Sequence, residues 1–211
     1  LSSQRGTIAM LDEDKQPLCN SYVWNCTRAI DYQAKFEAEI SPEEHQKLTG
    51  MQLSPLWTAA KIAWFRDNQP ALFEKTHWFA NGQEYFLYKL GAEEWMTDPA
   101  SLTLNGMMDI ANLDWSDKIL SMCGITRDKL PPVGVPSGVA GSLSKQAAAL
   151  TGLPEGITLC RGAGDQQCAA IGAGVIKQGM AEFTVGTSGV MVGHLDSLDR
   201  IKGNNLWWGG H

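Results

Sequence analysis

The sequence lacks the long apolar runs and the regular cysteine and histidine spacings that mark several common protein classes. No run of about 18 apolar residues could form a membrane-spanning helix, and the first residues do not follow a signal-peptide pattern. The five cysteines are odd in number and show no C-x-x-C pair, and the four histidines show no metal-ligand spacing. These absences predict a cytoplasmic protein with neither disulfides nor metal-ligating residues.

The familiar glycine-rich nucleotide motifs are also missing. No G-x-x-x-x-G-K-[ST] loop is present, and Gly172-Ala173-Gly174 is not part of a G-x-G-x-x-G fingerprint. A net charge of −6 argues against nucleic acid as the main partner. An acidic chain can still bind a nucleotide through backbone N–H groups, helix ends and Mg²⁺.

What the sequence does contain is the composition of a folded protein with a core. Hydrophobic residues make up 44% and charged residues 19% of the 211 residues, and repeats and low-complexity tracts are absent. This length allows one large domain, or one domain and part of another. Because the chain begins at Leu1 and ends on Trp-Trp-Gly-Gly-His, we expect it to be an internal piece of a longer protein.

The first three-quarters of the chain is predicted to contain short strands followed by many helices. Residues 6–11 read as a strand, a turn at 12–17 leads into a second extended segment, and residues 22–24 can form a further short strand. Capping residues, proline, glycine and helical periodicity then predict a helix-rich middle. The expected helices cover 27–40, a segment from 41, a segment from 54, 81–91, 116–123 and 144–150.

From Ile157 onward the pattern changes to an α/β unit. We expect strands at 157–160, 181–185 and 190–194, a helix at 166–173, and tight glycine turns at 162–165 and 186–189. Loops beyond the carboxyl ends of strands are where open α/β sheets usually bind ligands. The two glycine turns are therefore the places to look for chemistry.

Asp165 is the sharpest catalytic candidate. It follows Gly162-Ala163-Gly164, where a ligand can approach the backbone closely, and it stands at a predicted helix start that favours a carboxylate. A carboxylate can accept the proton of an alcohol that attacks a phosphoryl group. The same Gly-Asp pattern also fits an ordinary helix cap.

The second glycine turn has two hydroxyl residues between its glycines. Gly186-Thr187-Ser188-Gly189 can present N–H and O–H donors to phosphate oxygens. It equally suits a β-hairpin connection. Upstream, Gln4 and Arg5 could donate to substrate hydroxyls and Trp24 could pack on a carbon face. An exposed arginine and a core tryptophan are the alternative there.

Taken in order, these motifs resemble the FGGY carbohydrate kinases. The strongest match is the stretch from Gly162 to Gly174 together with Gly186–Gly189. The resemblance implies that Asp165 is the catalytic base, that Gln166 contacts substrate, and that Gly186, Thr187 and Ser188 form a phosphate motif.

Weaker matches precede these in the family's order. Ser3–Gly6 is similar to a substrate-binding segment, which implies substrate contacts for Gln4 and Arg5, and Val23–Arg28 is similar to the family's W-x-D-x-R, where Trp24 would line the pocket. Further matches are Thr49-Gly50 to Ser54-Pro55 with Lys61–Trp64, and Thr97–Ser101.

Departures from the family pattern bear on the substrate. Cys26 replaces the usual Asp, Gly6 replaces a Glu of glycerol kinases, and Leu56-Trp57 replaces their Tyr-Phe. Because these changes remove polar contacts for a three-carbon polyol, a pentulose such as xylulose is favoured over glycerol.

The resemblance implies an actin-like, ribonuclease H-like α/β fold with a helical insertion. Residues 1–160 would form most of an N-terminal sugar-binding domain, and residues 161–211 its end and the start of an inter-domain region. The implied reaction is phosphorylation of a sugar or polyol hydroxyl with ATP and Mg²⁺. The chain alone would be inactive, no nucleic acid or membrane partner is expected, and a homodimer is left open.

Two other interpretations stay open. One is a non-catalytic sugar-binding protein on the same scaffold, with Cys26 and Gly6 marking a lost pocket. The other is an actin-like ATPase of the chaperone or filament type, for which the Trp24–Arg28 segment would have no purpose.

Overall fold

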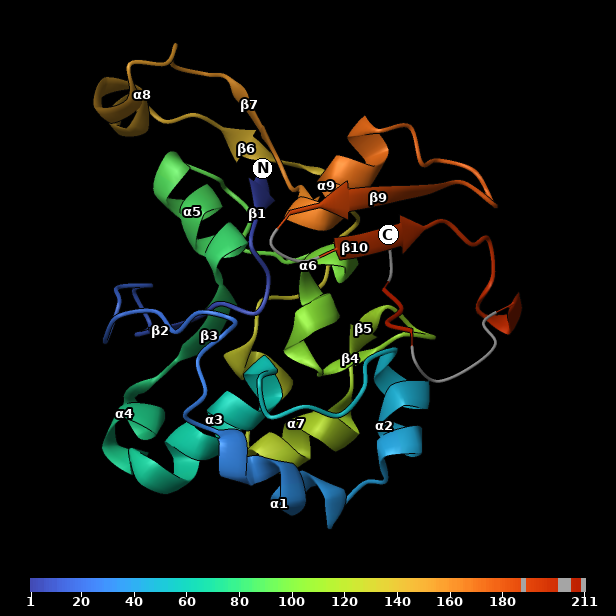
Figure 1. Ribbon diagram of the computed structural model, residues 1–211. Coiled ribbons are helices and arrows are strands. Elements are labelled where there is room, and N and C mark those ends of the chain that lie inside the picture. The colour runs from blue at the N-terminus through green and yellow to red at the C-terminus, as the bar shows by residue number, and fades with distance from the viewer. Residues whose placement is uncertain (187–188, 201–205, 210–211) are drawn as a thin grey trace.

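The computed structural model describes residues 1–186, 189–200 and 206–209, and it has a mixed α/β architecture (Figure 1). Its strands are β1 Ser2–Ser3, β2 Ile8–Leu11, β3 Trp78–Asn81, β4 Met108–Asp109, β5 Asp114–Trp115, β6 Val139–Ser142, β7 Thr158–Cys160, β8 Ala163–Gly164, β9 Ala181–Val185 and β10 Gly189–Gly193. Its α-helices are α1 Gln33–Glu37, α2 Pro42–Thr49, α3 Thr58–Asn68, α4 Pro70–Lys75, α5 Gly82–Leu90, α6 Pro99–Leu102, α7 Asp117–Cys123, α8 Lys145–Thr151 and α9 Asp165–Gly172. Short 3₁₀ turns are η1 Ile30–Tyr32, η2 Thr103–Asn105, η3 Arg127–Lys129 and η4 Leu198–Arg200.

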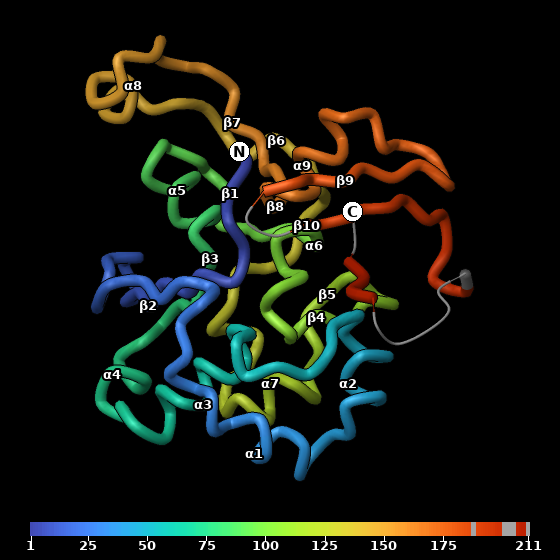
Figure 2. The backbone as a smooth tube through the Cα atoms, in the orientation of Figure 1, coloured from blue at the N-terminus to red at the C-terminus, as the bar shows by residue number. Residues whose placement is uncertain are grey.

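Strands pair two by two in the described part of the chain. The pairs β2–β3, β4–β5, β6–β7 and β9–β10 are antiparallel, and only β1 and β8 run parallel. The helices α1 to α4 and α7 gather at one end of the molecule, whereas α9 and the β9–β10 hairpin lie toward the other (Figure 1). The β6–α8–β7 segment projects from this second end as an arm (Figure 2).

The main hydrophobic core lies within the helical end. It is built around α3, which is buried along most of its length, packs against α4 and α7, and shares one buried cluster with residues of β2 and β3. Ile62 and Phe65 of α3 and Ile119 of α7 are fully buried there. This core holds α3 in place beneath the segments that follow β1 and β2.

Most predicted helix ends in the middle region are confirmed. The side chain of Ser41 accepts a hydrogen bond from the Glu44 N–H at the start of α2, at 3.1 Å. Gly91 ends α5 and Gly124 ends α7, each with a left-handed backbone. Ser144 caps α8 through the Ala147 N–H, at 3.2 Å.

Three predictions for local structure were wrong. Residues 27–40 form only η1 and the short α1, with Tyr32 as the last residue of η1 and the N-cap of α1. The Tyr32 hydroxyl donates to Asp67 and accepts from Asn68. Of residues 22–24, only Tyr22 pairs, through a bridge to Ile8. Residues 162–165 are not a tight turn, because Ala163 and Gly164 extend to pair with β1.

A buried polar network joins the starts of α5 and α6. The Asp98 carboxylate caps α6 through the Ser101 N–H and hydroxyl, at 3.0 and 2.8 Å, and also accepts from Gln83. Beside it, burial raises the pKa of Glu84, while the hydrogen bond from the Asn81 amide, at 3.0 Å, acts in the opposite direction. The network fixes α6, which packs against β8 and so supports the strand that leads to Asp165.

Candidate active site

Asp165 lies where the parallel strands β1 and β8 end. Ser2 pairs with Ala163 and Ser3 with Gly164, so the carboxyl ends of both strands reach the same edge. Helix α9 begins there, with Gly164 at its N-cap position and Asp165 as its first residue. Asp165 is exposed at this helix start, where the backbone dipoles favour a carboxylate.

Arg5 emerges from the neighbouring strand and crosses over Gly164. A Cβ atom added to Gly164 would lie 2.2 Å from Arg5 Cδ and 2.4 Å from its Nε, so glycine is needed for this close approach. Burial lowers the pKa of the Arg5 guanidinium, and the negative charge of Asp165 acts in the opposite direction. The structure thus brings Arg5 and Asp165 together from opposite ends of the chain.

Several buried polar atoms at this edge have no hydrogen-bond partner among the described residues. They are the Arg5 Nε and the side-chain oxygens of Gln166 and Gln167 on α9. Buried polar groups in native proteins are almost always paired. Unpaired donors and acceptors around a carboxylate are the groups that a hydroxylated ligand can satisfy.

Trp24 lies beside the same segment. Gly6 has a left-handed backbone, with φ at +67°, and a Cβ there would lie 3.3 Å from the Trp24 Cβ. Trp24 sits on a tight turn closed by the Cys26 N–H to the Val23 carbonyl, at 3.1 Å, and half of its surface is exposed. Gln4 is exposed and donates to the Thr7 hydroxyl at 2.9 Å.

The residues that depart from the family pattern have defined contacts. Cys26 Sγ accepts a hydrogen bond from Arg28 Nε at 3.1 Å, and the Arg28 guanidinium stacks 3.7 Å from the Tyr22 ring centre. Burial raises the pKa of the Cys26 thiol, but the hydrogen bonds and charge of Arg28 and the charge of Lys61 outweigh it and lower the pKa overall.

Trp57 is a packing residue in this structure. It is buried against Gly106, and its indole N–H donates to the Gln52 carbonyl at 2.6 Å. Leu56 beside it is half-buried. Neither residue offers a polar group in place of a phenol.

The predicted phosphate motif is only partly described. Thr187 and Ser188 lie outside the described residues, while Gly186 directly follows β9 and Gly189 begins β10. Strand β10 packs against α9, the helix that starts with Asp165. Within the described ranges, no cluster of three or more His, Cys, Asp or Glu side chains could hold a metal ion.

Cavity volume alone would not have found this site. A cavity of about 680 Å³ lies at the helical end instead, lined by residues of α7 and η3 together with Phe73 and Phe79.

In the described part of the chain, no helix has the length and apolarity needed to cross a membrane. Gly164 was expected to let a ligand approach the backbone, whereas in the structure the room it leaves is filled by the Arg5 side chain. Lys61 was matched only as part of a helix motif, and its contacts with Gly6, Val23 and Trp24 were not predicted.

Comparison with known proteins identifies the class of protein. Residues 1–172 match the N-terminal domain of the FGGY family of carbohydrate kinases, and the chain belongs to this family. The resemblance inferred from the motifs is thereby confirmed.

Individual relatives include kinases of different acceptors. The chain is 30% identical to the xylulose kinase of Bacillus subtilis over 200 residues, which is 94% of this chain and 40% of that protein. It is 30% identical to the glycerol kinase of Thermococcus kodakarensis over 210 residues, 98% of this chain and 41% of that protein. The crystal structure of Plasmodium falciparum glycerol kinase with ADP superposes with a TM-score of 0.82 at 26% identity, covering 90% of this chain and 38% of that one. The chain thus spans about two-fifths of the length of these relatives.

Proposed function

We propose that the protein containing this chain transfers a phosphoryl group from ATP to a hydroxyl of a sugar or polyol, with Asp165 as general base. The observation that carries this proposal is the meeting of Arg5 and Asp165 at the β1–β8 edge, beside buried polar atoms with no partner among the described residues. Family membership supplies the reaction class. On this proposal the chain carries the sugar-binding part of an actin-like fold, with residues 1–160 as its main domain.

The proposed chemistry assigns one proton to Asp165. The carboxylate accepts the proton of the acceptor hydroxyl while that oxygen bonds to the γ-phosphorus and the bond to the leaving ADP oxygen breaks. Arg5 and Gln166 would hold neighbouring hydroxyls of the acceptor. Gln4 and Trp24 would line the sugar site on the side of Gly6. As the first residue of α9, Asp165 presents its carboxylate at the edge where β1 and β8 end.

The nucleotide would be held only in part by this chain. When bound, ATP with Mg²⁺ supplies the phosphoryl group and neutralises charge on the phosphate oxygens. Gly186, Thr187 and Ser188 would contribute backbone and hydroxyl donors to the phosphates. The donor set of such a turn fits phosphate, and Mg²⁺ usually binds through phosphates and water with few protein ligands.

A pentulose such as xylulose is the acceptor that we favour over glycerol. The left-handed Gly6 supplies no carboxylate beside Trp24, and Trp57 has its N–H committed to Gln52. Cys26 is engaged with Arg28 in the place of an acidic side chain. With fewer polar groups for three adjacent hydroxyls, a longer sugar that also reaches Arg5 and Gln166 is the better match.

The test is a coupled ADP-release assay of the full-length protein against ketopentoses, sugar acids and glycerol. We expect the highest kcat/KM with a ketopentose. Asp165→Asn should lower kcat by about 100-fold or more, the usual contribution of a general base, with little change in acceptor binding. Asp31→Asn, at an exposed position of η1, is the matched control and should leave kcat unchanged.

The outcomes separate the competing functions. Unchanged turnover in Asp165→Asn would remove the base assignment. Sugar binding by calorimetry without ADP release would indicate the non-catalytic sugar-binding protein. ATP hydrolysis that no sugar or polyol stimulates would indicate an ATPase of another kind.

A further inference from the structure

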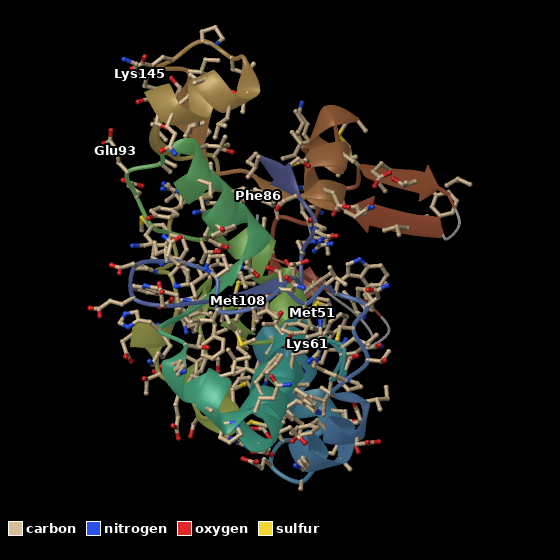
Figure 3. The ribbon with its side chains drawn as sticks, turned by 90° about the vertical axis from the view of Figure 1, so that its left-hand side faces the viewer. Met51, Lys61, Phe86, Glu93, Met108 and Lys145 are labelled. Carbon is tan, nitrogen blue, oxygen red and sulfur yellow. The ribbon has the colours of Figure 1, made fainter. Side chains whose placement is uncertain are left out.

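Lys61 of α3 is a buried cation next to the candidate site. Its side chain is 0% exposed, although lysine is almost never fully buried unless it is paired. Figure 3 shows Lys61 inside the molecule, whereas Lys145 lies at the outside on α8. No carboxylate of the described residues lies within ion-pair distance of the Lys61 Nζ.

The ammonium instead donates to three backbone carbonyls. Lys61 Nζ lies 3.3 Å from the Gly6 oxygen, 3.0 Å from the Val23 oxygen and 3.2 Å from the Trp24 oxygen. An ammonium has three N–H donors, so all of them are used. The three carbonyls come from two loops, one after β1 and one after the Ile8–Tyr22 bridge.

These two loops are the ones that carry the candidate acceptor-binding residues. Gly6 directly follows Arg5, and Val23 and Trp24 form the turn that presents the Trp24 indole. The loops touch where Gly6 meets the Trp24 Cβ. Next to this contact, Ile8 and Tyr22 join the same two segments through mutual hydrogen bonds of 2.9 Å.

We propose that Lys61 is a positioning residue that fixes the Arg5 loop and the Trp24 turn relative to each other, and thereby sets the shape of the acceptor site. This inference rests on the proposed kinase function. Helix α3 is a rigid base for the contact, since its neighbours Ile62 and Phe65 are anchored in the main core. A buried charge without a carboxylate partner destabilises a fold. Burying the Lys61 ammonium therefore lowers stability, which a residue with a purely structural role would not explain.

Burial also affects the ammonium itself. It lowers the pKa of Lys61 to about 8, with the facing groups Cys26 and Arg28 acting in opposite directions. At neutral pH the ammonium keeps three donors for three carbonyls. An apolar side chain of similar length, such as methionine, would leave all three carbonyls without this partner.

The experiment compares Lys61→Met with wild type in the full-length protein, by steady-state kinetics against acceptor and ATP separately. We expect the acceptor KM to rise by about 10-fold or more, because misplaced binding groups lose alignment, while the ATP KM changes by less than about 2-fold. Lys145→Met makes the same chemical change at an exposed site. Ile119→Val weakens the core without touching the two loops.

Hydrogen–deuterium exchange gives a readout that does not depend on activity. In Lys61→Met, the amides of Ile8, Tyr22 and Cys26 should exchange faster, because their hydrogen bonds lie in the freed loops. Neither Lys145→Met nor Ile119→Val should speed the exchange of these three amides selectively. Should Lys61→Met not fold, Lys61→Gln, which keeps two donors on a shorter side chain, provides the same comparison.

The results distinguish the two proposals. Equal effects on acceptor and ATP KM, or effects no larger than those of Ile119→Val, would overturn the positioning role. A wild-type protein that phosphorylates no acceptor would remove the kinase proposal, and exchange in the two loops would then still decide whether Lys61 fixes them.

Discussion

At the scale of single residues, the candidate site depends on the absence of a side chain at Gly164 as much as on the charged side chains of Arg5 and Asp165. Arg5 reaches Asp165 because Gly164 leaves room for its aliphatic stem. A methyl group at Gly164 would overlap Arg5 Cδ and Nε, and Arg5 would have to move. The position of the arginine is therefore set by the residue before Asp165.

Gly164→Ala should accordingly raise the acceptor KM by about 10-fold or more, because a shift of about 1 Å in a binding group is enough to disturb alignment. The measurement is acceptor kinetics of the full-length protein. Gly172→Ala is the control at the other end of α9, where an added Cβ meets nothing within 4 Å. An unchanged KM in Gly164→Ala would show that Arg5 does not bind the acceptor from this position.

At the scale of elements, helix ends were predicted well because their signals are local. Ser41, Gly91, Gly124 and Ser144 act within one turn of their helices, so neighbouring residues suffice to identify them. At the start of α2, Ser41 and Glu44 make only half of a capping box. Its Ser41 accepts from the Glu44 N–H, but the Glu44 carboxylate bonds Lys118 of α7.

Ser41→Ala should destabilise the protein by about 1 kcal/mol through loss of the N-cap of α2. The measurement is the thermal unfolding midpoint, compared with wild type at the same pH and salt. Ser121→Ala, on the exposed face of α7, should leave the midpoint nearly unchanged. Equal unfolding midpoints of the two variants would mean that the Ser41 cap stabilises the protein by less than the usual amount of about 1 kcal/mol.

At the scale of the whole molecule, stability should depend on pH through Lys61. The pKa of this buried amine is lowered to about 8 from its ordinary 10.5. Between these two pH values the unfolded chain holds more protons than the folded one, so stability rises with pH in that window. Below pH 8 the cost of the buried charge is fully present.

We therefore expect wild type to gain stability relative to Lys61→Met between pH 8 and 10.5, by an amount on the order of 3 kcal/mol. The measurement is the difference in unfolding free energy between the two proteins at each pH. The difference between wild type and Lys145→Met should stay constant. A flat difference for Lys61 would mean that its ammonium is not buried as the structure places it.

The sequence alone determined the family, the reaction class it implies and most helix ends, because these follow from short motifs and local capping. It also singled out Asp165, though as either a base or a helix cap. Tertiary structure decided that residues 163–164 are extended, that Arg5 lies over Gly164, and that Lys61 joins two loops. Each of these contacts links residues about 40 to 160 positions apart, and pairing over such distances is set by the packing of the whole chain, which no local pattern encodes.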